Sequence, residues 1–108
     1  MEGKLQFIKR CVRGGNIWWS YHSNMRLGNR SIRRETVVES VERCQIIEDY
    51  PTGHPLPSCL CLSRDEAGDA IHYVIAMDKK VDSVRFVTVY RPDPSKWTSD
   101  FRTRRGTK

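Results

Sequence analysis

The stretch HSNMRLGNR, residues 22–30, places one histidine and two arginines four residues apart. If the stretch is helical, His22, Arg26 and Arg30 lie along one face, because residues at i and i+4 are neighbours on a helix. An imidazole above two guanidinium groups suits proton transfer beside a phosphate group. The alternative is that His22 caps the helix and that the two arginines pair with acidic residues of the same chain.

A second group of side chains that could transfer protons or bind phosphate lies around the last predicted strand. Tyr90 and Arg91 end that strand and precede PDPSKW, whose prolines stop further pairing and keep Lys96 and Trp97 in a loop. His72 lies in a central predicted strand. The alternatives are a His72 that is hydrogen-bonded within the sheet, a Tyr90 that belongs to the core and a Trp97 that packs rather than stacks on bases.

Together these side chains supply imidazole, phenol, guanidinium and ammonium groups, without the clustered carboxylates that bind Mg²⁺. This set fits metal-independent cleavage of RNA, in which the ribose 2′-hydroxyl attacks the adjacent phosphate. We predict that the catalytic residues are His22, Arg26, Arg30, His72 and Tyr90. We predict that the RNA-binding residues are Arg91, Lys96, Trp97, Arg102 and Arg104. No metal and no cofactor is expected, and the motifs of serine hydrolases, nucleotide-binding enzymes and zinc proteases are missing from the sequence.

The net charge of +6 is unevenly distributed along the 108 residues. Residues 1–34 carry a net charge of +7, residues 35–83 carry −6 and residues 84–108 carry +5. If the two basic ends meet in the folded chain, one side of the surface attracts a polyanion, most simply nucleic acid. The alternative is a solvated basic face without a ligand.

Length and composition predict a single domain over residues 1–108, since 38% of the residues are hydrophobic and 30% are charged. No targeting segment and no run of roughly 20 apolar residues is present, so we expect a cytoplasmic protein without a membrane partner. The four cysteines lack metal-site spacing, which favours buried, reduced thiols. In CLCL, Cys59 and Cys61 share one face of a predicted strand, and Leu60 and Leu62 share the other.

Three helices are expected in the first part of the chain. EGKLQFIKRCVRGG has Leu5, Ile8 and Val12 at helical spacing and ends at two glycines. NIWWSY is a brief extended segment, and the HSNMRLGNR stretch forms a short second helix. SIRRETVVESVERCQII, with apolar residues at intervals of three and four from Val37 to Cys44, forms the third helix.

Strands and turns are expected from residue 45 onward. QIIEDY, SCLCLS, AIHYVIAM and VRFVTVYR are separated by turn sequences rich in Pro, Gly and Asp. Alternation places one set of side chains on a common face of the last strand: Val84, Phe86, Thr88 and Tyr90. Helices followed by about four antiparallel strands predict an α+β fold with the helices on one face of the sheet. The end, SDFRTRRGTK, is tail-like in composition.

The series H-x-x-x-R-x-x-x-R-x-I at residues 22–32, followed by IIEDYP, PSCLCL, IHYVIA and VTVYRPDPSKW, resembles an uncharacterised bacterial domain family of unknown function. Members of this family are often encoded beside a short zinc-finger protein of the YgiT type and are grouped with RelE, ParE, BrnT and MqsR-like toxins. The resemblance covers nearly the whole chain and implies a RelE-like toxin fold, with helices packed on a curved antiparallel sheet. Arg33 stands where relatives tend to have a capping Ser or Thr.

The resemblance also implies a function. It identifies the chain as the toxin of a type II toxin–antitoxin system and as a metal-independent endoribonuclease, with RNA, including ribosome-associated mRNA, as substrate. The expected partner is a cognate antitoxin in the form of a small zinc-finger protein. The shared pattern includes these candidate residues: His22, Arg26, Arg30, His72, Tyr90, Arg91 and Lys96. The alternative function is a non-catalytic basic module that binds nucleic acid or an acidic partner protein.

Overall fold

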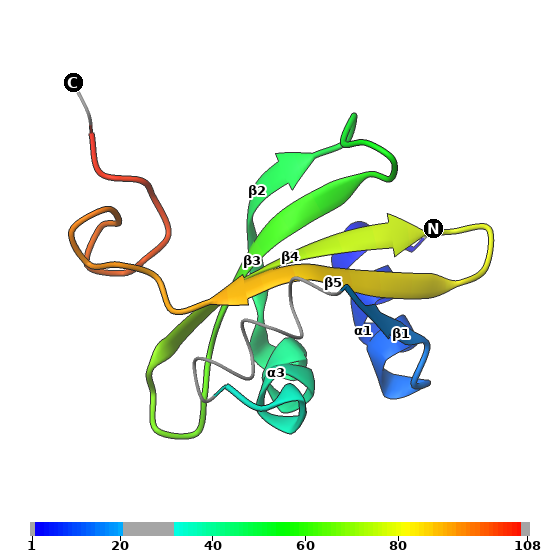
Figure 1. Ribbon diagram of the computed structural model, residues 1–108, viewed down its shortest axis with the longest axis horizontal. Coiled ribbons are helices and arrows are strands. Elements are labelled where there is room, and N and C mark those ends of the chain that lie inside the picture. Colours follow the sequence, from blue (N-terminus) through cyan, green and yellow to red (C-terminus); the bar gives the residue numbers. More distant parts are fainter. Residues whose placement is uncertain (1, 21–31, 107–108) are drawn as a thin grey trace.

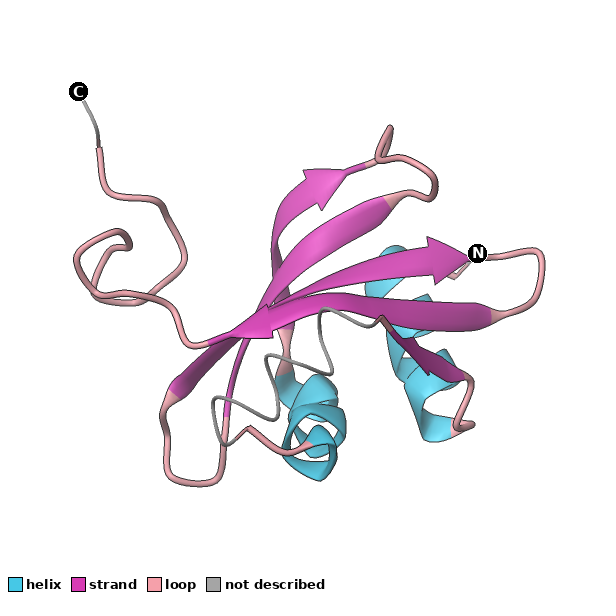
Figure 2. Ribbon diagram, viewed as in Figure 1, coloured by secondary structure: helices cyan, strands magenta, loops and turns pink. Residues whose placement is uncertain are grey.

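The computed structural model describes residues 2–20 and 32–106, so His22, Arg26, Arg30 and the predicted second helix lie outside the described residues. Within the described ranges the elements follow in this order: α1 (Lys4–Arg13), β1 (Ile17–Trp19), α3 (Arg34–Ser40), the 3-10 turn η1 (Val41–Arg43), β2 (Gln45–Tyr50), β3 (Ser58–Arg64), β4 (Ala70–Asp78) and β5 (Ser83–Tyr90). Figures 1 and 2 show the helices below one open sheet. The predicted α+β class is confirmed.

The sheet has five strands in the order β1-β5-β4-β3-β2. Strands β2 to β5 form the predicted antiparallel meander, while β1 adds a short fifth strand parallel to β5. The sequence predicts only an extended segment here, because three residues give no sign of their partner strand. Packing fixes that partner: the Trp19 and Phe86 rings are stacked with centroids 4.6 Å apart. The sheet is therefore mixed rather than purely antiparallel.

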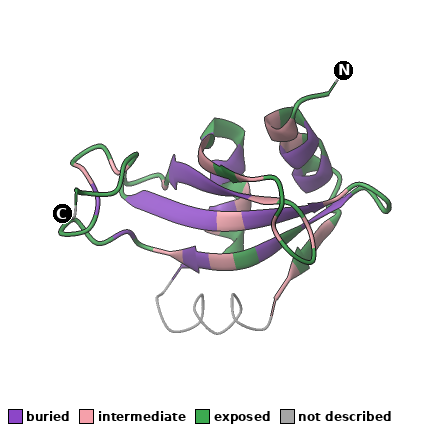
Figure 3. Ribbon diagram, turned by 90° about the horizontal axis from the view of Figure 1, so that it is seen from above, coloured by how far each residue is buried: buried purple, intermediate pink, exposed green. Residues whose placement is uncertain are grey.

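The hydrophobic core lies between the helices and the face of the sheet that they cover, and Figure 3 shows buried stretches in purple on both the helices and the strands. Both helices supply one buried stripe, as their apolar spacing predicts, and α1 ends at Gly14 as expected. The sheet contributes the side chains Cys59, Cys61, Ile71, Tyr73, Ile75, Met77, Val84, Phe86 and Val89. All four cysteines are buried and free, and the predicted faces of β3 are confirmed. Each large apolar side chain in this layer stabilises the fold by about 1.5–3 kcal/mol.

One polar contact inside this layer joins α3 to the sheet. The buried Tyr73 hydroxyl lies 3.0 Å from Ser40 Oγ, and Ser63 Oγ donates to the Ser40 carbonyl at 2.7 Å. Because buried polar atoms are costly when unpaired, these bonds fix how α3 docks on β3 and β4.

A bulge in β5 overturns the predicted face of Tyr90. Val74 pairs with Thr88 and Ile75 pairs with Phe86, so Val87 is an extra residue without a partner in β4. Beyond it the alternation is reversed: Val89 enters the core, and Tyr90 points to the outer face of the sheet. The prediction that Thr88 and Tyr90 share the face of Phe86 is wrong, because strict alternation holds only for an unbulged strand.

The chain after β5 is not a tail in residues 91–106. It turns back on itself through the pairing of Trp97 with Arg104, and Arg105 N–H donates to the Lys96 carbonyl at 2.9 Å. The Trp97 side chain is only 4% exposed, so the segment is packed against the protein. A segment rich in charge and turn residues is thus held by one aromatic anchor.

Helix α1, which carries part of the basic N-terminal third, does not meet the basic C-terminal segment. Helix α1 and the C-terminal segment lie at opposite ends of the sheet (Figure 1). The arginines of α1 pair instead with carboxylates elsewhere in the chain: Arg10 contacts Asp82 at 3.2 Å, and Arg13 contacts Glu42 at 2.7 Å. Folding therefore pairs part of the N-terminal charge internally, and since Arg26 and Arg30 lie outside the described residues, the predicted basic side stays a prediction. In the described part of the chain, no helix is long and apolar enough to span a membrane.

The bulge makes a testable prediction about one-residue deletions. Deleting Val87 leaves a regular ladder with Phe86 and Val89 still inward, so the free energy of unfolding should fall by about 1 kcal/mol or less. Deleting Arg85, an exposed residue of the same strand, moves Val84 off the core face and should cost about 2 kcal/mol or more. Urea unfolding measures both variants, and equal losses would contradict the assigned bulge.

Candidate functional site

The reversed face of β5 brings two predicted catalytic residues together on the outer side of the sheet. His72 and Tyr90 are direct partners in the β4–β5 ladder, and His72 Nδ1 lies 3.0 Å from the Tyr90 hydroxyl. The other ring nitrogen, Nε2, lies 2.9 Å from the Phe101 carbonyl. A carbonyl only accepts, so Nε2 carries the proton and Nδ1 accepts from the Tyr90 hydroxyl.

His72 is fully buried, although it faces away from the main core. Burial lowers the pKa of His72 below its ordinary value of 6.5, because the charged imidazolium is poorly solvated there. The bond to the Phe101 carbonyl and the charge of Glu48 oppose this shift, but burial is the larger effect. The neutral tautomer is therefore the form that fits this site.

Trp97 covers His72 and connects it to a cation. The two rings meet edge to face with centroids 4.4 Å apart, and the Arg104 guanidinium lies 4.7 Å from the Trp97 ring centroid. Trp97 is the aromatic anchor of the C-terminal segment, which agrees with the packing alternative for this residue. Arg104 remains accessible, with 62% of its side chain exposed.

Arg104 in turn holds a carboxylate on β2. Its Nε and Nη2 atoms donate to the two oxygens of Glu48 at 2.9 and 3.1 Å, and the Tyr50 hydroxyl also donates to Glu48. The Arg104 bonds hold the pKa of Glu48 below its usual value of 4.5, against the effect of partial burial. Burial and the neighbouring carboxylate raise the pKa of Tyr50 to about 12.

These contacts form one continuous group that we call the outer-face cluster: Glu48, Tyr50, His72, Tyr90, Trp97 and Arg104. It combines an ionised carboxylate, a guanidinium and a protonated phenol at a partly exposed rim, above a neutral buried imidazole. A carboxylate can take a proton from a hydroxyl, a phenol can return one, and a guanidinium can stabilise charge on phosphate. The arrangement thus holds the groups that RNA transesterification requires.

Glu48 and Tyr50 are the members of the cluster that the sequence predictions miss. The sequence does contain their signal: in IIEDYP they alternate with Asp49, so a strand places both on the same face. Asp49 bonds to Lys4 of α1 on the other side. A single Glu beside a Tyr has no metal-site spacing, so residue type alone does not single out this pair.

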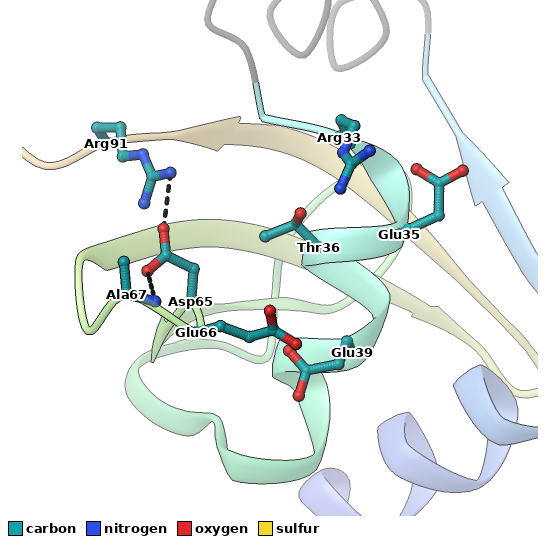
Figure 4. Close-up of a pocket in the computed structure, with 8 residues that line it drawn as sticks. All are labelled: Arg33, Glu35, Thr36, Glu39, Asp65, Glu66, Ala67 and Arg91. Atoms are coloured by element: carbon teal, nitrogen blue, oxygen red, sulfur yellow. Dashed lines mark hydrogen bonds and ion pairs between the residues drawn. The ribbon is translucent and has the colours of Figure 1, made fainter.

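Arg91 lies apart from the cluster, in a cleft of about 530 Å³ between α3 and the β3–β4 turn (Figure 4). Its guanidinium contacts Asp65 at 2.9 Å and donates to the Ala70 carbonyl at 3.3 Å. The lining of the cleft combines two arginines with four acids: Arg33, Arg91, Glu35, Glu39, Asp65 and Glu66. This acidic surrounding does not attract phosphate, and Arg91 serves here to hold the turn.

Arg102 lines a different hollow, of about 290 Å³, together with Arg43 and Arg64. Its only carboxylate neighbour among the described residues is Asp100, 3.9 Å away. Lys96 is exposed in the turn before Trp97. These cations border the C-terminal segment, whereas the predicted residues of the HSNMRLGNR stretch lie outside the described residues. The roles assigned to all ten predicted site residues stay predictions.

Residues 19–91 match the model of a protein family described as a domain of unknown function (DUF4258). The predicted membership of an uncharacterised domain family is therefore confirmed. No curated protein and no solved structure matches the chain. Within residues 2–20 and 32–106, no three His, Cys, Asp or Glu side chains are grouped so that they could hold a metal ion.

The buried His72 predicts a specific dependence of stability on pH. Its pKa is lower in the folded chain than in the unfolded chain, so the unfolded state binds the proton first as the pH falls. The free energy of unfolding should therefore be largest above about pH 6.5 and should decrease between about pH 6.5 and pH 5. Chemical unfolding at a series of pH values measures this slope.

Two variants test the assignment of that slope. His72→Phe should remove it, and at pH 7 should cost about 1–3 kcal/mol, because the Tyr90 hydroxyl and the Phe101 carbonyl lose their partner. His54→Gln changes an exposed histidine and should keep the slope. A slope that survives in His72→Phe would show that another group causes it.

Proposed function

The chain belongs to the DUF4258 family, and on that premise we propose that the outer-face cluster is the active site of a metal-independent endoribonuclease of the toxin type. The observation that carries the proposal is the Glu48 carboxylate, which is ionised, partly exposed and held by both Arg104 and Tyr50. Glu48 is the general base in this proposal. RNA in the cytoplasm is the substrate, and a cognate antitoxin protein is the partner that restrains the activity.

The proposed reaction uses three side chains. Glu48 takes the proton from a ribose 2′-hydroxyl, and the 2′-oxygen attacks the adjacent phosphorus. The bond from phosphorus to the 5′-oxygen breaks, and that oxygen receives the proton of the Tyr50 hydroxyl. Arg104 stabilises the charge on the phosphate oxygens during this step. The products are a 2′,3′-cyclic phosphate and a 5′-hydroxyl, and the proton on Glu48 then returns to Tyr50 along their hydrogen bond.

The other members of the cluster position these groups. Arg104 lies on the Trp97 ring, and that ring rests on the buried His72, which bonds to Tyr90. Lys96 and Arg102 lie on the same segment and supply charge for the RNA backbone. His72 thus acts through Trp97 rather than on the substrate.

A second candidate function is RNA binding without cleavage. The observation that favours it is the full burial of His72, which leaves no imidazole of the described residues in reach of a phosphate at this site. Both functions predict salt-sensitive RNA binding, so the chemistry of the RNA ends separates them. Intact RNA after incubation with the purified protein would favour the binding function.

Substitutions in the cluster test the proposed general base. Glu48→Gln should reduce the rate of RNA cleavage by about 10²-fold or more, because the amide cannot accept the 2′-hydroxyl proton. Tyr50→Phe should reduce it by at least about tenfold through loss of the proton donor. Single-turnover cleavage of a labelled RNA, with analysis of the product ends, measures both effects.

The ion pair of Arg13 and Glu42 provides the matched control, since it has the same two-bond geometry at a remote place. Glu42→Gln should cleave RNA at the rate of the unchanged protein. Equal cleavage by Glu48→Gln and Glu42→Gln would refute the proposed site. Growth of cells that express each variant provides the corresponding test of toxicity.

The Arg104–Glu48 bonds also predict how cleavage depends on pH. Since Arg104 lowers the pKa of Glu48, the acidic limb of kcat/KM should lie below pH 4.5, the usual value for Glu. Arg104→Ala should raise that pKa and move the limb to higher pH, whatever its effect on the maximal rate. Arg13→Ala should leave the limb in place, and NMR titration of the Glu48 carboxyl carbon gives the same pKa without any activity. An unmoved pKa in Arg104→Ala would contradict the assigned coupling.

A further inference from the structure

A surface without a role in the proposed reaction lies where β4 ends and β5 begins. Trp18 of β1 is 63% exposed there, and Val81 of the β4–β5 turn is 65% exposed. Large apolar side chains that are this exposed to solvent and lie in a group usually mark a surface that binds a partner. Trp in particular is enriched at the centres of protein interfaces.

Two adjoining hollows extend this exposed pair into one surface. The first, of about 200 Å³, is lined by Trp18, Val81, Leu56 and Arg85 among others. The second, of about 610 Å³, also contains Leu56 and is lined mainly by apolar side chains: Pro51, Pro55, Leu56, Pro57 and Met77. Leu56 and Asp78 line both hollows, so the two hollows adjoin each other. We call this region the apolar end surface.

The rim of the apolar end surface is basic. Lys79, Lys80 and Arg85 line the two hollows beside one carboxylate, Asp78, while the fourth lining cation, Lys4, is paired with Asp49. One oxygen of Asp78 accepts the backbone N–H of Lys80, so that carboxylate is already used within the turn. An apolar floor with a positive rim is complementary to a chain that carries apolar and acidic side chains together.

We propose that the apolar end surface docks an acidic, amphipathic segment of a partner protein. Apolar side chains of that segment fill the proline-lined hollow and cover Trp18, while its carboxylates meet Lys79, Lys80 and Arg85. The aliphatic and proline floor favours a peptide over nucleic acid, because single strands bind mainly by stacking bases on aromatic rings. The surface shares no residue with the outer-face cluster, so docking and RNA cleavage can be tested separately.

The test uses the full chain and a defined probe. The probe is a fluorescein-labelled peptide of about three helical turns that alternates pairs of glutamates with pairs of leucines. Its binding, measured by anisotropy, should be at least about tenfold tighter than that of the same peptide with lysines in place of the glutamates. The acidic peptide should also change the fluorescence of Trp18, and a short single-stranded RNA should not compete with it.

Matched variants locate the binding. The double variant Lys79→Glu with Lys80→Glu should weaken binding of the acidic peptide by about tenfold and should strengthen binding of the lysine peptide. A misfolded protein could not show that gain in affinity. The control is Arg102→Glu with Arg105→Glu, which changes the charge equally at the opposite end of the sheet (Figure 1). Val81→Ser should weaken binding by about tenfold, whereas Val87→Ser, at an exposed valine outside the hollows, should not.

Three results would overturn the proposal. They are equal binding of the acidic and lysine peptides, displacement of the acidic peptide by RNA, and unchanged binding in both the Val81→Ser and the lysine variants. Cleavage of RNA should be the same as in the unchanged protein for the variants at Lys79, Lys80, Val81 and Val87, none of which belongs to the outer-face cluster or to the proposed RNA-binding residues. A failure here therefore leaves the proposed ribonuclease site standing, and a failure of that site leaves this surface standing.

Discussion

The extra residue in β5 determines which side chains meet on the outer face of the sheet. Because Val87 has no partner in β4, Val89 stays in the core and Tyr90 turns outward beside His72. A regular strand of the original length would direct Tyr90 towards the helices and leave the His72 ring without its hydroxyl partner. The local twist of a bulge also re-aims the chain that follows the strand. The course of residues 91–106 therefore begins at this irregularity.

The buried His72 then holds the C-terminal segment in place. Its Nε2–H bonds to the Phe101 carbonyl, and its ring meets Trp97 edge to face, while the Arg104 guanidinium lies over the Trp97 ring. The bond from the Tyr90 hydroxyl depends on the neutral imidazole, since protonation would turn Nδ1 into a second donor and the Tyr90 oxygen would have to accept instead. Among the described residues, no buried side-chain nitrogen or oxygen lacks a hydrogen-bond partner. A polar network that is fully paired specifies a single arrangement, and here that arrangement delivers Arg104 to Glu48.

Most of the described elements could be predicted from the sequence, because hydrophobic spacing reports the faces of helices and strands. The predicted third helix over residues 31–47 is too long, since α3 ends at Ser40 and β2 begins at Gln45. The face shared by Ile71, Tyr73, Ile75 and Met77 is buried as alternation requires. The spacing of hydrophobic residues does not reveal the bulge at Val87. One extra residue in β5 reverses the alternation of its side chains but leaves the composition of the strand typical of β structure. Pairing of β1 with β5 depends on a contact between Trp19 and Phe86, which are far apart in the chain. The composition of the C-terminal segment indicates a tail, but a single buried Trp97 outweighs it.

The candidate site was harder to predict for a related reason. His72, Tyr90, Trp97 and Arg104 were chosen by residue type, and three-dimensional pairing then added Glu48, which joins them only through Arg104. Pairing also occupies charged side chains: Arg10, Arg13 and Arg91 are engaged with carboxylates of the same chain. This pairing is local, because the net charge of +6 already counts these carboxylates and is not changed by it. In the proposed function, recognition of RNA at the outer-face cluster rests on the fixed geometry of Arg104 and Glu48 rather than on the overall field.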